Sequence, residues 1–150
     1  MSTRSRIGIL NDDGTVDSIY CHFDGYISNN GKILQEHWTD PAKMAELIAL
    51  GDISSLAAEI GVKHPFDNPF DFNTPEHTAF RDQYRGMTTF YGRDRGDSDC
   101  EFKVIQSEKE LFEVYGWCEY YYLMRNGVWL VASGHYDGWK LLTDAIRELD

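Results

Sequence analysis

The chain has 150 residues, the usual size of one domain, and we predict a single domain over 1–150. Hydrophobic residues make up 42% and aromatic residues 14% of the chain, which excludes a disordered composition. The net charge is −11, and a field of this sign repels nucleic-acid phosphates and anionic membranes. Direct nucleic-acid binding is therefore disfavoured. The charge fits plain solubility, or an acidic surface that imitates nucleic acid and occupies a basic groove.

No apolar segment approaches the roughly 20 residues that a membrane span needs. The first residues, MSTRSRIGIL, lack the apolar core of a signal peptide, so we expect a soluble protein of the cytoplasm with no membrane partner. Cys21, Cys100 and Cys118 share no CxxC spacing, which favours free thiols over disulfides or a zinc site. We predict no cofactor.

The chain begins with a predicted β-hairpin. RIGIL and TVDSIYC alternate like strands, and Asp13-Gly14 between them favours a two-residue turn. The second strand ends at the segment His22–Gly25. Apolar residues at helical spacing then predict a helix over 27–38.

Two further helices and a long irregular segment follow. Asp40 is a good N-cap with Pro41 at the first helical position, and this helix stops at Gly51. A short helix is predicted over 53–60. Residues 62–86 carry three of the chain's 4 prolines, which argues against a long helix or a central strand. Their phenylalanines predict an ordered loop packed across the core, and such long loops are often functional.

The second half predicts strands in MTTFYG and CEFKVIQ, separated by the charged turn RDRGDSD. Ser107 and Glu110 form a capping box, which predicts a helix over 108–115. Asn126-Gly127 is a strong signal for a hairpin between WCEYYYLM and VWLVASG. A terminal helix is predicted to place four apolar residues on one face: Trp139, Leu142, Ile146 and Leu149.

A short block occurs near both ends of the chain. Residues 11–26 read NDDGTVDSIYCHFDGY, and residues 124–139 read MRNGVWLVASGHYDGW. When the two blocks are aligned without a gap, identical residues stand at matching positions. Gly14 matches Gly127, His22 matches His135, Asp24 matches Asp137 and Gly25 matches Gly138. Each copy predicts a hairpin strand, a His-aromatic-Asp-Gly turn and a helix. We therefore expect an α+β domain whose antiparallel sheet has about six strands, with helices mainly on one face and the two copies related by a local pseudo-twofold.

The repeated polar residues admit two interpretations. In the structural one, each aspartate caps the following helix, and Gly25 and Gly138 supply an unusual φ. In the functional one, two imidazoles and two carboxylates converge, which suits a divalent metal or acid–base chemistry. A third use is a ligand or partner pocket. The residues concerned are His22, Asp24, Tyr26, His135, Asp137 and Trp139.

A second candidate is an arginine cluster in the stretch 81–95. Arginine forks bind carboxylates and phosphates in a bidentate manner, so the cluster fits pairing with Asp82, Asp94 and Asp97 or binding of a nucleotide. The stretch lacks the glycine spacing and the Lys-Ser/Thr pair of a phosphate loop. The cluster consists of Arg81, Arg85, Arg93 and Arg95.

A third candidate is an acidic run that forms a solvated face or presents charge to a basic partner. The aromatic residues of 115–122 fit a buried strand as well as a homodimer face. No Gly-x-Ser-x-Gly, HExxH or cysteine-centred catalytic signature is present. The run comprises Asp97, Asp99, Glu101, Glu108, Glu110, Glu113 and Glu119.

Several strings in this chain resemble a family of small accessory proteins of bacteriophages, prophages and plasmids. They are TRSRIGI, DGTVDSIYCHFDGY, GKILQEHW, LIALGDISSL and FYGRDRG, which together span much of residues 3–96. The resemblance implies a phage-type origin and a role in the host bacterial cytoplasm, and it assigns no catalytic residues. By analogy, small acidic phage proteins often bind and disable a host enzyme or defence complex.

The main hypothesis is therefore a non-enzymatic accessory protein that binds and inhibits or redirects a host protein or defence complex, with acidic mimicry of nucleic acid as one means. A small enzyme that uses the repeated blocks, with a divalent metal or with His and Asp alone, is the first alternative. A nucleotide-binding module that uses the arginine cluster is the second.

Overall fold

A computed structural model describes residues 3–62, 69–83, 86–133 and 138–149. The strands are β1 (Ser5–Leu10), β2 (Val16–Cys21), β3 (Ile53–Ser55), β4 (Thr89–Phe90), β5 (Lys103–Ile105), β6 (Tyr120–Arg125), β7 (Val128–Ser133) and β8 (Lys140–Leu141). The helices are the π-helix η1 (Ile27–Gly31), α1 (Lys32–His37), α2 (Pro41–Ala49), α3 (Pro75–Gln83), α4 (Glu110–Val114) and α5 (Leu142–Arg147). In this part of the chain no helix is long and apolar enough to cross a membrane.

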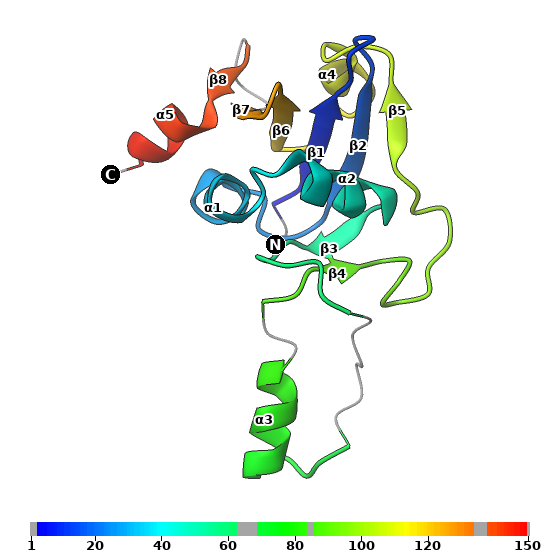
Figure 1. Ribbon diagram of the computed structural model, residues 1–150, viewed down its shortest axis with the longest axis vertical. Coiled ribbons are helices and arrows are strands. Elements are labelled where there is room, and N and C mark those ends of the chain that lie inside the picture. The colour runs from blue at the N-terminus through cyan, green and yellow to red at the C-terminus, as the bar shows by residue number, and fades with distance from the viewer. Residues whose placement is uncertain (1–2, 63–68, 84–85, 134–137, 150) are drawn as a thin grey trace.

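The strands form one mixed sheet in the order β4-β3-β2-β1-β6-β7-β8, and β5 also pairs with β2 (Figure 1). The α+β class is confirmed, whereas the antiparallel sheet of about six strands is wrong. Within the described ranges the sheet has 8 strands, and the pairs β1–β6 and β2–β3 are parallel. The β1–β6 pair forms where the two hairpins lie side by side, because β1 and β6 are the first strands of these hairpins.

The two hairpins confirm the predicted turns to different degrees. Asn126 and Gly127 have φ of 52° and 78°, as a two-residue turn requires. In the first hairpin the Asn11 N–H donates to the Thr15 carbonyl at 2.8 Å, so the loop is longer than predicted. Gly14, with φ of 89°, takes the left-handed position of this longer loop.

The helices α1, α2 and α5 cover one face of the sheet, and α4 packs on the other. The larger core cluster joins Leu34 of α1, Leu47 of α2 and Leu142 of α5 to residues of the strands. Ile7 and Tyr122 are two of these strand residues. The smaller cluster joins Leu111 of α4 to a second set of strand residues: Val16, Ile105, Tyr121, Leu123 and Ala132. Because both faces are covered, β6 is buried continuously from Tyr121 to Met124.

Of the predicted signals for helix ends, the two at α2 are confirmed and the one before α4 is wrong. Asp40 accepts the Ala42 N–H at 3.0 Å, and Gly51 follows α2 with φ of 90°, as predicted. The capping box at Ser107 is wrong. The N-cap of α4 is Lys109, and the Glu110 carboxylate instead accepts the Gln106 N–H at 3.2 Å.

The predicted helix over 53–60 is wrong, because its first residues form β3. Ile53 pairs with Cys21 of β2 and with Phe90 of β4. The open edge of β2 offers backbone partners that a short isolated helix lacks, and this tertiary pairing outweighs local preference.

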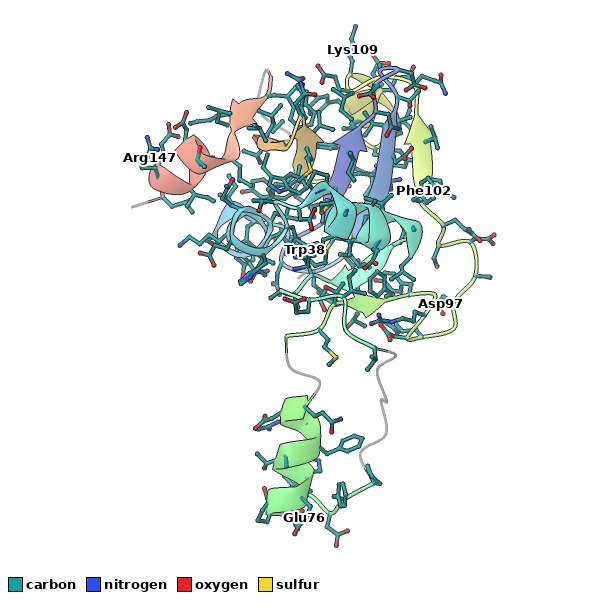
Figure 2. The ribbon with its side chains drawn as sticks, in the orientation of Figure 1. Trp38, Glu76, Asp97, Phe102, Lys109 and Arg147 are labelled. Carbon is teal, nitrogen blue, oxygen red and sulfur yellow. The ribbon has the colours of Figure 1, made fainter. Side chains whose placement is uncertain are left out.

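The segment 62–86 is also different from the prediction. It contains α3, whose N-terminus is capped where the Thr74 hydroxyl accepts the His77 N–H at 3.2 Å. No described residue of α3 is buried, and the helix lies away from the sheet (Figure 1). Figure 2 shows Glu76 of α3 far from Trp38 in the core. The described part of this segment is therefore a projecting arm and not a loop packed across the core.

Candidate functional site

The first repeated block is held at the edge where β2 ends. The His22 N–H donates to the Ile53 carbonyl at 3.2 Å, and the Phe23 N–H donates to the Ser54 carbonyl at 2.9 Å. The Gly25 N–H donates to the Thr3 carbonyl at 2.8 Å. The block is therefore fixed between β3 and the residues that lead into β1.

The roles predicted for Asp24 and Gly25 are wrong. Asp24 itself adopts a left-handed φ of 56°, and its side chain does not cap η1, whose N-cap is Tyr26. Gly25 is needed for space, because an added Cβ would lie 2.8 Å from both the Thr3 carbonyl oxygen and the Ser5 Cβ. The glycine thus allows the turn to pack closely against the start of β1.

The second block leaves the sheet at the same edge. Cys21, Ser5, Tyr120 and Ser133 form one row of paired residues across β2, β1, β6 and β7. Two strands separate the ends of β2 and β7, which places their backbones ~14 Å apart at ~4.8 Å per strand. His135 and Asp137 lie outside the described residues, so their predicted convergence with His22 and Asp24 stays a prediction.

A continuous line of rings, which we call the aromatic row, lies at this edge and consists of Phe23, His22, Tyr20, Trp117 and Tyr115. Ring centroids are 4.5 Å apart between Phe23 and His22 and 5.8 Å apart between His22 and Tyr20. Trp117 continues the row at 5.2 Å from Tyr20 and 6.5 Å from Tyr115. The row therefore joins the end of β2 to the segment between α4 and β6.

Two arginines support the row from β1 and the residue before it. The Arg4 guanidinium lies 5.3 Å from the Trp117 ring centroid, and that of Arg6 lies 3.7 Å from the Tyr115 centroid. Arg6 is almost fully buried, and its Nε donates to the Ser18 hydroxyl at 2.9 Å. Burial lowers the pKa of Arg6, and the Tyr115 ring face offsets part of that cost by a cation–π contact.

Arg4 also fixes Glu119. Its backbone N–H donates to the Glu119 carboxylate at 2.7 Å, and its guanidinium does so at 3.3 Å. Burial acts to raise the pKa of Glu119, but these hydrogen bonds outweigh it and hold the pKa below its usual value. Glu119 is therefore ionised at neutral pH and keeps Arg4 in place over the row.

A hollow of about 560 Å³ lies next to the row. Tyr26 of the first block and Ser133 at the end of β7 line it together with Glu119. The structure thus brings Tyr26 to the same edge as the row. Trp139 does not line this hollow, and its ring lies 5.3 Å from that of Phe112 of α4.

Among the described residues, one side-chain hydrogen bond joins two members of the row. The Tyr20 hydroxyl is 2.6 Å from Nδ1 of His22, which directly follows β2 and still shares a face with the residue two positions before it. Burial raises the pKa of Tyr20 to about 12, so the hydroxyl keeps its proton at neutral pH. In the described part of the chain, the His22 side chain contacts Tyr20 and Phe23, and its ring is not hydrogen-bonded to Asp24.

An acidic loop borders the row on the side of β3. Asp52 accepts the Tyr20 N–H at 2.8 Å, and its own N–H donates to the Cys100 carbonyl at 2.7 Å. Burial raises the pKa of Asp52. We name the acidic loop by its exposed carboxylates: Asp97, Asp99 and Glu101.

The arginine cluster is not assembled as one site. Arg93 donates to the Gly61 and Thr88 carbonyls and to the buried Asp94 carboxylate at 3.0–3.2 Å, which uses its fork within the chain. Arg81 lies on α3 and pairs with Asp82 at 3.5 Å. Arg95 is exposed over the Tyr91 ring, and Arg85 lies outside the described residues.

No group of three or more histidine, cysteine or acidic side chains within the described ranges is placed to hold a metal ion. All three cysteines are free. Comparisons with family models, with characterised proteins and with solved structures found no match to this chain.

Sequence reasoning named Tyr26 and His22, and it named Trp117 only as part of the aromatic stretch 115–122, but it missed Tyr20 and Arg4. A signal for Tyr20 is present, since its spacing of two from His22 on a strand predicts a shared face. Nothing in the sequence indicates that Trp117 meets them, because this contact depends on the parallel pairing of β1 with β6.

Proposed function

We propose that this chain is a non-enzymatic binding protein, and that the aromatic row docks on a basic, nucleic-acid-binding groove of a host or defence protein. The observation that carries the proposal is the row itself, five rings from two distant segments, bordered by the acidic loop. A phage-type accessory role, suggested by the resemblance of the sequence, fits this activity.

The exposed part of the row has the composition of a protein-binding hot spot. Trp117 is 48% and Phe23 43% exposed, and Tyr26, which lines the hollow next to the row, is 39% exposed. Trp, Tyr and Arg dominate the binding energy of protein interfaces. The ring contacts and the Tyr20–His22 hydrogen bond hold these side chains in place before binding, so less entropy is lost on association.

The acidic loop and the net charge of the whole chain favour a basic partner. Two hydrogen bonds link Tyr20 through Asp52 to the carbonyl of Cys100, which lies between Asp99 and Glu101 of the acidic loop. The whole chain carries a net charge of −11, which accelerates encounters with positively charged surfaces. Aromatic side chains next to carboxylates reproduce the bases and phosphates that such a groove binds.

The test uses the purified chain as bait in a bacterial lysate, with the retained proteins quantified by mass spectrometry. The variant Phe23→Ser/Trp117→Ser removes the exposed rings. Its control is Val128→Ser/Leu141→Ser, which removes two apolar side chains of similar exposure, 48% and 44%, from other strands.

We expect a stoichiometric partner that the wild type and the control retain equally and that duplex DNA displaces. The ring variant should retain at least about 30-fold less, which corresponds to a hot-spot loss of about 2 kcal/mol. Equal retention by the ring variant, or the absence of any stoichiometric partner, refutes the proposal. Failure of DNA to compete refutes the basic groove.

A further inference from the structure

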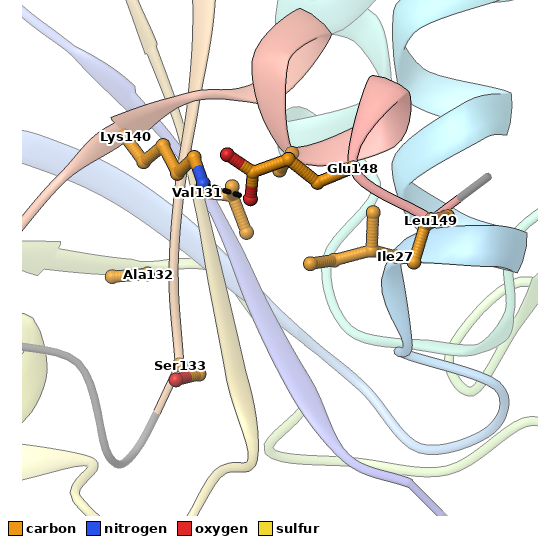
Figure 3. Close-up of a pocket in the computed structure, with 8 residues that line it drawn as sticks. Ile27, Val131, Ala132, Ser133, Lys140, Glu148 and Leu149 are labelled. Carbon is orange, nitrogen blue, oxygen red and sulfur yellow. Dashed lines mark hydrogen bonds and ion pairs between the residues drawn. The ribbon is translucent and has the colours of Figure 1, made fainter.

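A second hollow lies on the opposite side of β7 from β6, under α5. It has a volume of about 300 Å³ and is formed by the end of β7, the start of β8, η1 and the C-terminal end of α5 (Figure 3). The β7–β8 pairing covers Leu130 and Val131, and the hollow extends beyond it to Ser133.

Its walls are mainly apolar. Ile27, Val131, Ala145 and Leu149 contribute aliphatic side chains from three different elements and the end of the chain. An engineered apolar cavity of about 150 Å³ takes up benzene. This hollow therefore has room for a ligand with roughly twice as many heavy atoms as benzene. Its volume is also at the lower end of the range of ligand pockets.

Among the described residues that line the hollow, the charged ones are Lys140 and Glu148, which form an ion pair (Figure 3). The two partners differ in their exposure. The Lys140 side chain is 26% exposed and belongs to β8, whereas that of Glu148 is 66% exposed at the C-cap of α5. Lys140 is therefore a fixed cation beside an apolar hollow, and Glu148 is a carboxylate that can return to water.

We propose that this hollow binds a small carboxylic acid with an apolar tail, whose carboxylate replaces that of Glu148 on Lys140. The tail fills the space between Ile27, Val131 and Ala145. The exposed carboxylate of Glu148 contributes little free energy to its ion pair, so its release costs little. The carboxylate of the ligand makes a stronger charged hydrogen bond to Lys140 in the sheltered hollow, and burial of the tail adds to the affinity. The proposal is independent of the aromatic row.

The exchange is compatible with the negative charge of the chain. At physiological salt the Debye length is about 8 Å, so distant carboxylates are largely screened. When Glu148 is released, the carboxylate of the ligand takes its place. The number of carboxylates next to the Lys140 ammonium is therefore unchanged, and so is the local electrostatic field.

Isothermal titration calorimetry with octanoate as the probe tests this site on the full chain. The variant Lys140→Gln should weaken binding at least about tenfold, because it removes a charged hydrogen bond. Glu148→Gln should tighten binding by up to about fivefold, because it removes the internal competitor. The matched controls are Lys109→Gln and Glu113→Gln, which break the exposed pair at 3.8 Å on α4 and should leave the affinity unchanged.

The chemical comparison uses octanol and octylammonium at the same concentrations. We expect octanoate to bind more tightly than either, because only its head group is attracted to the lysine. Absence of octanoate binding at millimolar concentration overturns the proposal. It is also overturned if octanol or octylammonium binds as tightly as octanoate, or if Lys140→Gln has no more effect than Lys109→Gln.

Discussion

Gly25 provides a sharp test of how the first block is built. The repeated Asp-Gly suggested a glycine that adopts an unusual φ, whereas the structure gives the positive φ of 56° to Asp24. At Gly25 the constraint is space. An added Cβ would meet the Thr3 carbonyl oxygen at 2.8 Å and the Ser5 side chain at 2.8–2.9 Å. The substitution Gly25→Ala therefore forces the turn away from β1.

The size of the effect follows from two opposing contributions. Overpacking a closely packed site costs about 1–3 kcal/mol of folding free energy. Loss of glycine's freedom in the unfolded chain returns about 0.4–1 kcal/mol. The movement also strains two hydrogen bonds, from the Gly25 N–H to the Thr3 carbonyl and from the Tyr122 hydroxyl to the Gly25 carbonyl at 2.6 Å. We expect a net loss of about 1–2 kcal/mol.

Urea unfolding followed by tryptophan fluorescence measures this loss, and Gly25→Asn separates the two explanations. Asparagine tolerates a left-handed φ better than alanine but is larger. If space is the constraint, Gly25→Asn is at least as destabilising as Gly25→Ala, while Asp24→Gly is neutral or stabilising. The reasoning is refuted if Gly25→Ala changes the free energy of unfolding by less than ~0.5 kcal/mol or if asparagine restores stability.

Three further predictions concern other parts of the fold. Asp40→Ala removes the cap of α2 and should lower the free energy of unfolding by about 1 kcal/mol in urea titrations, and an unchanged midpoint would show that the cap does not stabilise the protein. Arg93→Lys cannot reproduce a fork that bonds two carbonyls and a buried carboxylate, so it should destabilise by about 2–3 kcal/mol, whereas the exposed Arg95→Lys should change stability by less than ~0.5 kcal/mol. Burial raises the pKa of Tyr20 from 10.0 and that of Cys118 from 9.0, each to about 12. Since the folded chain holds these protons more tightly, their stabilisation is complete below the unfolded values and is lost as pH rises towards about 12; a free energy of unfolding that stays constant from pH 9 to 12 would contradict this.

Local backbone chemistry was predictable from the sequence. Asn126-Gly127 specifies a two-residue turn because both residues accept a positive φ, and Asp40 before Pro41 specifies the start of α2. Thr74 before Pro75 carries the same type of signal for α3, although the surrounding prolines concealed it. These features depend on a few neighbouring residues, so they can be read without knowledge of the fold.

Contacts between distant segments were decided only by the tertiary structure. Ile53 belongs to a strand because the edge of β2 provides hydrogen-bond partners, and Gly25 is required because Thr3 approaches it. The repeated block identified His22 and Tyr26, but Trp117, which contacts Tyr20 in the same row, comes from a segment about 95 residues away. Trp117 reaches the row because β6 pairs in parallel with β1. The sequence does not indicate this pairing, because the backbone hydrogen bonds between two strands are the same whatever their side chains. The sequence alone therefore determined the turns and caps, while the sheet order determined which side chains meet at the candidate site.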